Sequence, residues 1–391
     1  MPFGYLVAIT LFTWCTLVAL APVRRPAPLA HLSFFSAVLF NELPFVAFLL
    51  LVVTIASNVG HSGLDSAAAW AGGVGLTVVV VLGLALIALR ELQTGPAVER
   101  AMGDGLGADW RTDIDEKLAA RLRRRLPYMR ILFAPVFFRR KDVERIADIR
   151  YGDAGKWNLL DVYRPRSRPP SAPVLIHLHG GAFATGRKNR EARPLLYRLA
   201  SQGWVCISAN YRLGRATRFP EHVIDAKRVI AWVREHGSEH GADPAMIFVA
   251  GTSAGAHIAA IAALTPNDPA FQPDFEGMET SVAAAVLLSG YYGPLGRTRL
   301  PSAPEAYRRA DAPPFLVAHG QLDVLVPADR ARHFVDRLRA KSSNPVVYAE
   351  LPGALHSFDL FHSIRFEHVV DGIEAFAAWV RSRPLEAANL R

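Results

Sequence analysis

Three long apolar stretches near the start of the chain predict helices that cross a membrane. Residues 3–23 carry no charge, and at about 1.5 Å per residue they can cross a hydrocarbon layer of about 30 Å. Two further apolar stretches run from Leu32 to Ile55, where Glu42 interrupts the pattern, and from Ala67 to Leu89. A carboxylate near the end of a span is typical of a packed or snorkelling residue. The pattern therefore predicts about three spans within residues 1–92.

Positive charges beside these stretches predict their orientation. Arg24 and Arg25 follow the first stretch and Arg90 follows the third, whereas the loop after the second holds Asp65 and neither lysine nor arginine. Positive residues favour the cytoplasmic side, so we expect a multi-pass protein of the cell membrane with Met1 outside and the rest of the chain after the spans in the cytoplasm. A cleavable signal peptide is the alternative for the first stretch, but two more apolar stretches follow it.

Residues 93–144 predict a linker that ends in a basic amphipathic segment. Ile114, Leu118 and Leu122 recur at every fourth position, with arginines between them. The segment from Leu126 to Lys141 mixes aromatic and basic residues, which is typical of a segment at a membrane interface. A cap packed on the following domain is the alternative for this segment.

Residues 145–391 alternate between short apolar runs and helical faces. This alternation predicts a single α/β domain in which helices flank a mainly parallel sheet. The predicted strands are Ile146–Tyr151, Asn158–Tyr163, Val174–Leu178, Val205–Ala209, Met246–Ala250, Val282–Leu288, Phe315–Ala318 and Val346–Glu350. The predicted helices are Pro194–Ser201, Pro220–His236, Ala254–Leu264, Ala328–Ala340 and Phe366–Ser382.

Composition and charge exclude several classes of function. The 391 residues are 51% hydrophobic with a formal charge of +9, and no nucleic-acid-binding motif accompanies this charge. We therefore expect membrane lipid, and no nucleic acid, as the partner of the basic stretch Arg121 to Arg125. Cys15 and Cys206 lie in apolar stretches and the histidines lack the spacing of a zinc site, so we expect no disulfide, metal or other cofactor.

The sequence Gly251-Thr252-Ser253-Ala254-Gly255 matches GxSxG. In this motif a nucleophilic serine occupies a strained turn between a strand and a helix, where the glycines leave room. A strand before the turn and a helix after it are both predicted independently of the motif. We therefore expect Ser253 to be a nucleophile.

A second glycine-rich turn, His179 to Phe183 (HGGAF), directly follows another predicted strand. Attack on an acyl carbon places negative charge on its oxygen, which backbone N–H groups can stabilise if they already point there. We expect Gly180, Gly181 and Ala254 to form such an oxyanion hole, with Ala254 at a helix N-terminus that favours an anion.

A serine needs a base, and histidine is the usual one because it titrates near neutral pH. His356 lies on a loop after the last predicted strand, whereas the rival His319 sits at a strand end where a packed histidine is ordinary. The base in turn needs a carboxylate to orient it. Asp323 follows the preceding strand, whereas Asp329 lies in a helix and Asp359 is too close to His356 in sequence. The predicted catalytic order is serine, aspartate, histidine.

Together these residues resemble the α/β-hydrolase superfamily, in particular the esterases akin to hormone-sensitive lipase and the related arylformamidase-like and feruloyl-esterase-like carboxylesterases. The resemblance covers residues 145–385 and includes LDVYRP at 160–165, NYRL at 210–213 and DAK at 225–227. It departs from the HGGG pattern at Ala182.

The resemblance implies a two-step acyl transfer without metal or cofactor, and the predicted spans favour hydrophobic, lipid-like acyl esters as substrates. An amidase, a peptidase or an acyltransferase with the same triad is the enzymatic alternative. A membrane scaffold on an inactive hydrolase fold is the alternative of another class. The oligomeric state is not predicted.

Overall fold

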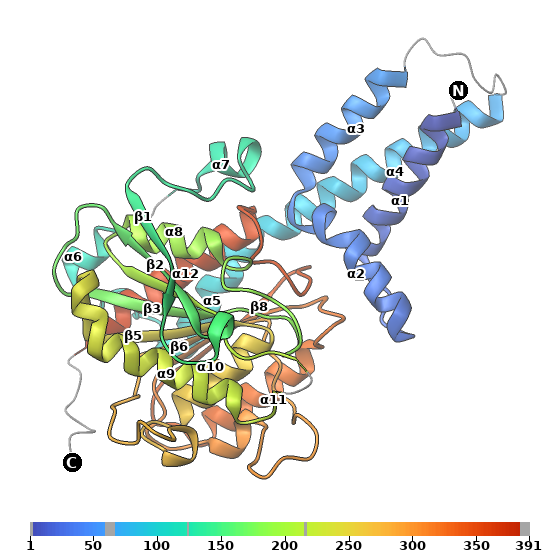
Figure 1. Cartoon of the computed structure of the whole chain (residues 1–391). Helices are drawn as coiled ribbons and strands as arrows, with labels where there is room; N and C mark the ends of the chain where they lie inside the picture. The colour runs from blue at the N-terminus through green and yellow to red at the C-terminus, as the bar shows by residue number, and fades with distance from the viewer. Residues whose placement is uncertain (1–2, 59–66, 123–124, 215–216, 384–391) are drawn as a thin grey trace.

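An eight-stranded sheet forms the centre of the chain beyond residue 142 in the computed structural model, which describes residues 3–58, 67–122, 125–214 and 217–383 (Figure 1). The strand order is β1-β2-β4-β3-β5-β6-β7-β8; β2 runs antiparallel to both β1 and β4, and the neighbours from β4 to β8 are parallel. The mainly parallel sheet is thus confirmed. The strands are β1 Val143–Arg150, β2 Leu159–Pro165, β3 Ala172–Leu178, β4 Val205–Ala209, β5 Ala242–Thr252, β6 Ala284–Leu288, β7 Phe315–Gly320 and β8 Val346–Leu351.

Helices cover both faces of this sheet, and the side chains of β3 show why. Val174, Ile176 and Leu178 point into one buried core, whereas Leu175 points into the other, as the alternation of a strand requires. The α-helices of the domain are α8 Arg193–Ser201, α9 Glu221–His236, α10 Ala254–Leu264, α11 Ala328–Arg339 and α12 Ile364–Arg381. Helices α9, α10 and α11 pack on the first core and α8 and α12 on the second. Short 3-10 helices lie at Gly155–Asn158, Gly237–His240, Pro269–Phe271 and Pro304–Tyr307.

The N-terminal helices project from one side of this domain (Figure 1). They are α1 Phe3–Leu20, α2 Ala27–Glu42, α3 Pro44–Asn58 and α4 Ala67–Leu92, and α1, α3 and α4 run side by side away from the sheet. By length and apolarity, α1 and the helix that α4 forms with α5 (Thr94–Leu106) can cross a membrane. Helices α2 and α3 add a third span only if the pair is taken as one broken span.

The expected span from Leu32 to Ile55 is not one straight helix. Helices α2 and α3 meet at 93°, and the break falls at Leu43 and Pro44. Proline lacks the N–H that would continue the hydrogen bonding of α2, and its fixed φ suits the first position of a new helix. Only α3 continues in the direction of the other apolar helices, and α2 lies across them (Figure 1).

A buried polar cluster joins α2 to the catalytic domain. The Arg365 guanidinium, in the first turn of α12, pairs with Glu42 and donates to the side-chain oxygen of Asn41 at 2.9 Å. Ser363 donates to Glu42 at 3.0 Å, and the amide of Asn41 donates to the carbonyl of Gly353 at 3.0 Å. Glu42 is therefore packed against the domain rather than extended toward solvent, because Arg365 neutralises its charge.

The region expected to be a linker is also part of the fold. Helix α5 packs against β8 and α12, and its residues Val98, Ala101 and Met102 belong to the second core. In the described part of the expected amphipathic segment, the structure has the short helix α6 (Glu116–Ala119), followed by α7 (Tyr128–Phe133). Through its apolar face, α5 thus joins α4, the longest N-terminal helix, to the sheet.

Candidate functional site

The turn between β5 and α10 holds Ser253 in a strained conformation. Its φ is 55°, a left-handed value that a residue with a side chain adopts only when its surroundings impose it. A Cβ on Gly255 would lie 2.0 Å from the carbonyl oxygen of Leu178, and one on Gly251 would lie 2.3 Å from the backbone of Gly255. Both motif glycines are therefore required by close backbone packing, and the turn presents the serine hydroxyl at the carboxyl edge of the sheet.

Ser253, His356 and Asp323 form a continuous chain of hydrogen bonds. Ser253 Oγ lies 2.8 Å from His356 Nε2, and His356 Nδ1 lies 2.6 Å from Asp323 Oδ2. The other carboxylate oxygen of Asp323 accepts the N–H groups of Leu325 at 2.9 Å and Val326 at 2.8 Å. These backbone donors fix the carboxylate, so that the orientation of the imidazole is determined as well.

The charges within this hydrogen-bonded chain shift the pKa values of Asp323 and His356. Burial alone would raise the pKa of Asp323, but the charge of His356 and hydrogen bonds from His319 and His356 lower it below its usual range. Burial alone would lower the pKa of His356, and the neighbouring Asp323 raises it above its ordinary value. The pair therefore favours an ionised carboxylate that stabilises a protonated imidazole.

The alternative candidates for the base and its carboxylate occupy other positions. His319 Nε2 lies 2.8 Å from the carbonyl oxygen of Val326 and 3.3 Å from Asp323, so it supports the carboxylate and makes no hydrogen bond to Ser253. Asp329 is exposed in α11. Asp359 is buried and accepts a hydrogen bond from Thr252 Oγ1 at 2.6 Å, one residue before the serine.

The HGGAF turn packs directly against Ser253, because a Cβ on Gly180 would lie 3.0 Å from the Cβ of Ser253. The N–H of Gly180, however, donates to the carboxylate of Glu191. This N–H cannot also face a substrate oxygen, which corrects the expectation for Gly180. Within the described part of the chain, the N–H groups of Gly181, Ala182 and Ala254 make no hydrogen bond and remain available as donors.

Sequence reasoning missed Glu191, which is buried below the turn and also pairs with Arg190. Burial and the charge of Glu191 raise the pKa of Asp359 to about 7. No local pattern marks Glu191, because its partner Gly180 lies across a loop and the carboxylate has neither motif nor periodicity around it. Two buried carboxylates, Glu191 and Asp359, thus lie next to the HGGAF turn and Ser253.

Three polar residues of the family-like motifs have structural partners. Asp161 binds Arg145 at 2.6 Å and Lys188 at 2.6 Å. Asp225 accepts hydrogen bonds from Arg212, and the hydroxyl of Tyr211 donates to the carbonyl of His179 at 2.7 Å. These contacts give Asp161, Asp225 and Tyr211 structural roles as hydrogen-bond partners.

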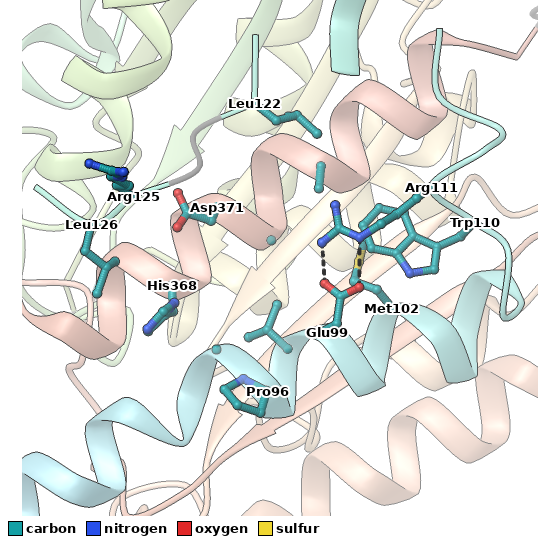
Figure 2. Close-up of a pocket in the computed structure, with 14 residues that line it drawn as sticks. Pro96, Glu99, Met102, Trp110, Arg111, Leu122, Arg125, Leu126, His368 and Asp371 are labelled. Carbon is teal, nitrogen blue, oxygen red and sulfur yellow. Dashed lines mark hydrogen bonds and ion pairs between the residues drawn. The ribbon is translucent and has the colours of Figure 1, made fainter. Parts of the chain in front are cut away.

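A cavity of about 1400 Å³ opens above Ser253. Its walls are mainly apolar, and they come from the turns of the sheet edge and from α2. The apolar lining includes Phe34, Phe35, Phe183, Leu295, Val324 and Leu360. A second cavity of about 380 Å³ lies between α5 and α12, where Glu99 and Arg111 form an ion pair of 2.5 Å (Figure 2). It contains none of the three residues of the hydrogen-bonded chain.

Among the described residues, no group of three or more histidine, cysteine, aspartate or glutamate side chains could hold a metal ion. Both cysteines are free and buried.

A mainly parallel sheet whose edge presents a strained serine to a histidine is the arrangement of an α/β-hydrolase. Comparison with known proteins agrees: residues 160–296 match the family BD-FAE. The chain is 36% identical to the probable carboxylic ester hydrolase LipM of Mycobacterium tuberculosis over 96% of this chain and 93% of LipM. It is 41% identical to the esterase LipC of the same organism over 60% of this chain and 65% of LipC.

The chain therefore belongs to the carboxylic ester hydrolase family that includes LipM. Among solved structures, it is similar to the butyrate-bound esterase 2 of Thermogutta terrifontis, with 25% identity, 56% of this chain and 86% of that chain covered, and a TM-score of 0.48.

Proposed function

We propose that this ester hydrolase works through Ser253 as nucleophile, His356 as general base and acid, and Asp323 as the carboxylate that orients the imidazole. The observation that carries the proposal is the hydrogen-bonded chain of 2.8 Å from Ser253 Oγ to His356 Nε2 and 2.6 Å from His356 Nδ1 to Asp323 Oδ2. A base within hydrogen-bond reach of the hydroxyl is what activation of a serine requires.

In the first step, Ser253 Oγ bonds to the acyl carbon while its proton passes to His356 Nε2. The carbonyl oxygen becomes negative and is held by the N–H groups of Gly181, Ala182 and Ala254, with the N-terminus of α10 adding its dipole. When the carbonyl re-forms, the alcohol leaves and takes the proton from His356. Water then attacks the acyl-enzyme with His356 again as base, and the free acid and Ser253 are restored.

We infer that the substrates are hydrophobic acyl esters. The cavity above Ser253 has room for a long chain, and its aromatic and aliphatic lining favours apolar groups over water. A small polar ester would leave most of this lining in contact with water. The value of kcat/KM should therefore rise with the length of the acyl chain until the cavity is filled.

We propose further that residues 1–92 anchor the enzyme in the cell membrane, with the catalytic domain on the cytoplasmic side. Arg24, Arg25 and Arg90 lie at the domain end of the apolar helices, in keeping with the preference of positive residues for the cytoplasm. A C-terminal reporter that is active only in the cytoplasm tests the orientation. Activity of a reporter that works only outside the cytoplasm would contradict it.

The segment from Leu126 to Lys141 supports this placement as an interfacial segment. It packs on the domain through Phe138, which belongs to the second core, as the alternative of a cap expects, but it does not line the cavity above Ser253. Its side chains Met129, Phe133 and Phe137 are 72%, 72% and 70% exposed, and Arg139 lies two residues after Phe137. Figure 1 shows α7 on the side of the domain from which the apolar helices leave. Exposed aromatic residues next to basic ones are typical of a lipid interface.

Replacement of the nucleophile tests the proposed chemistry. Ser253→Ala in the full chain should abolish turnover of 4-nitrophenyl butanoate and labelling by a fluorophosphonate probe. Ser238→Ala, at an exposed serine far from the cavity lining, is the matched control and should behave like the wild type. Retained turnover or labelling in Ser253→Ala would refute the assignment of the nucleophile.

A further inference from the structure

Helix α2, expected to begin a membrane span, forms one wall of the catalytic cavity. Its cavity-facing residues include Ala27, Ala30 and Phe34, and the Phe34 ring lies 6.4 Å from the imidazole of His356. The buried cluster around Glu42 fixes the end of the helix to the domain. Helix α2 is therefore fixed to the domain at its C-terminal end, and its middle, at Phe34, lies next to His356.

The other side of α2 is apolar as well. Leu29 and Leu32 are 47% and 54% exposed and do not line the cavity. A helix that is apolar on both sides needs an apolar partner on each of them. Helix α2 lies at 93° to α3, which runs beside α1 and α4, so α2 lies across the domain end of those helices (Figure 1). In the membrane placement proposed above, one side of α2 faces the cavity and the other faces lipid.

Two positive charges lie at the cavity next to the start of this wall. Arg24 and Arg25 line the cavity and are exposed, and no acidic residue of the described chain pairs with either. Arg190 lines the same cavity, but Glu191 neutralises it. At about 1.5 Å per residue, the first residue of α2 lies about 10 Å from Phe34, so one molecule can reach both ends.

We propose that the cavity accepts an amphiphilic ester from the membrane, with its acyl chain along α2 and a phosphate in its alcohol part bound by Arg24 and Arg25. This inference rests on the proposed function of Ser253. The apolar residues of α2 suit the acyl chain of the ester. The unpaired arginines suit its phosphate, since guanidinium groups bind phosphate through charge-assisted hydrogen bonds. The open cavity beside the lipid-facing helix gives such a substrate a path that avoids water.

The test compares two esters that differ only in the phosphate, 1-lauroyl-glycerol 3-phosphate and 1-monolauroyl-glycerol. The full-length protein in neutral detergent micelles is assayed for released laurate. We expect the wild type to prefer the phosphate ester by about tenfold in kcat/KM, the size of one charge-assisted contact. Arg24→Gln with Arg25→Gln should remove most of this preference. Arg330→Gln with Arg337→Gln, at exposed arginines of α11, changes the net charge equally and should retain it.

Each outcome separates one explanation from another. If Arg24 and Arg25 bind only head groups of the bilayer, the double variant keeps its preference in neutral micelles, and the inference is wrong. Equal turnover of both esters by the wild type also overturns it, while normal turnover of 4-nitrophenyl butanoate leaves the proposed catalytic triad standing. A wild-type protein that hydrolyses none of the three esters would overturn the proposed function itself.

The role of α2 as a wall of the cavity is tested separately, with a substitution on this helix that fills part of the cavity. Val38 lines the cavity on the side of Phe34 away from Arg24 and Arg25, so Val38→Trp should reduce kcat/KM for 4-nitrophenyl laurate by at least about tenfold relative to the acetate, because several methylenes of the laurate would lose their place. Leu29→Trp, on the same helix and outside the cavity lining, should leave the ratio unchanged. An equal chain-length profile in the two variants would show that α2 is not the acyl wall.

Discussion

The ring of Phe34 lies edge-on to the imidazole of His356, with ring centroids 6.4 Å apart and ring planes at 74°. Aromatic rings prefer this arrangement over a face-to-face stack. Phe34 belongs to α2 in the apolar N-terminal region, and His356 belongs to the loop after β8. The apolar N-terminal helices and the hydrogen-bonded chain at Ser253 therefore form one packed unit rather than two independent parts.

The acid limb of the pH profile should report the pKa of His356. Its imidazole accepts the serine proton only when neutral, and Asp323 raises its pKa above the ordinary value of 6.5. The midpoint of kcat/KM for a neutral ester should therefore lie above pH 6.5, and activity should be lost as the pH falls through it. Asp323→Asn removes the charge, so the midpoint should move to lower pH and kcat should fall by about 10⁴-fold.

Asp329→Asn is the matched control for this prediction, because it removes an equal charge from the exposed start of α11. Its pH midpoint and kcat should equal those of the wild type. A wild-type midpoint below pH 6.5, or the same shift in both variants, would contradict the role assigned to Asp323.

Glu191 should act as a positioning residue for the oxyanion turn. Its buried carboxylate accepts the N–H of Gly180, so Glu191→Ala would free the turn and misplace the donors at Gly181 and Ala182. We expect kcat to fall by about 10²-fold with little change in KM, as for the loss of one oxyanion donor. Glu191→Gln keeps a side-chain oxygen that can accept this N–H and should restore much of the activity.

The exposed Glu235 on α9 provides the control, since Glu235→Ala removes an equal charge away from the turn. Steady-state kinetics with 4-nitrophenyl butanoate measure all three variants. A purely structural role for Glu191 would change stability without separating kcat from KM, and glutamine would then give no rescue of turnover.

The sequence predicted the nucleophile turn and the order of the hydrogen-bonded residues because their signals are local. Ser253 lies between a run of strand residues and an alanine-rich helix, and both elements are found where they were expected. His356 and Asp323 follow strands of the same sheet, and parallel strands bring their carboxyl ends to one edge. Because of this topology, residues that follow different strands in the predicted order lie close together in the structure.

The features that were not predicted depend on contacts between distant segments. Glu191 has no motif around it, and its hydrogen bond removes Gly180 from the set of available donors. The sequence does contain the signal for the break after α2, which is Pro44, but a proline does not specify the direction of the bend. That direction follows from Arg365, far along the chain, which binds Glu42.

Removal of Arg365 should destabilise the protein strongly. Arg365→Met would leave Glu42 buried without its partner, which costs about 3–5 kcal/mol for a buried charge pair. The change appears as a lower thermal midpoint of the detergent-solubilised protein. The double variant Arg365→Met with Glu42→Gln removes this charge pair but leaves the buried Glu91, 3.9 Å from the Arg365 guanidinium, and should therefore recover only part of the loss. A double variant no more stable than the single one would contradict a direct pairing of the two charges.

The last prediction concerns contact between α7 and lipid. Because Cys15 and Cys206 are buried, Phe133→Cys adds a single accessible thiol that can carry an environment-sensitive fluorophore. In liposomes of anionic lipid the label should emit at shorter wavelength and be quenched by brominated acyl chains, because Phe133 is exposed and belongs to α7, which lies on the side of the domain from which the apolar helices leave.

Lys341→Cys carries the same label on an exposed residue just after α11, on the opposite side of the domain from α7 (Figure 1). It should show neither the shift nor the quenching. Equal quenching at both positions would mean that the label itself seeks lipid, and no quenching at either would place α7 in water. Quenching at position 133 alone would mean that the catalytic domain rests on the bilayer, beside α2 and the mouth of its cavity.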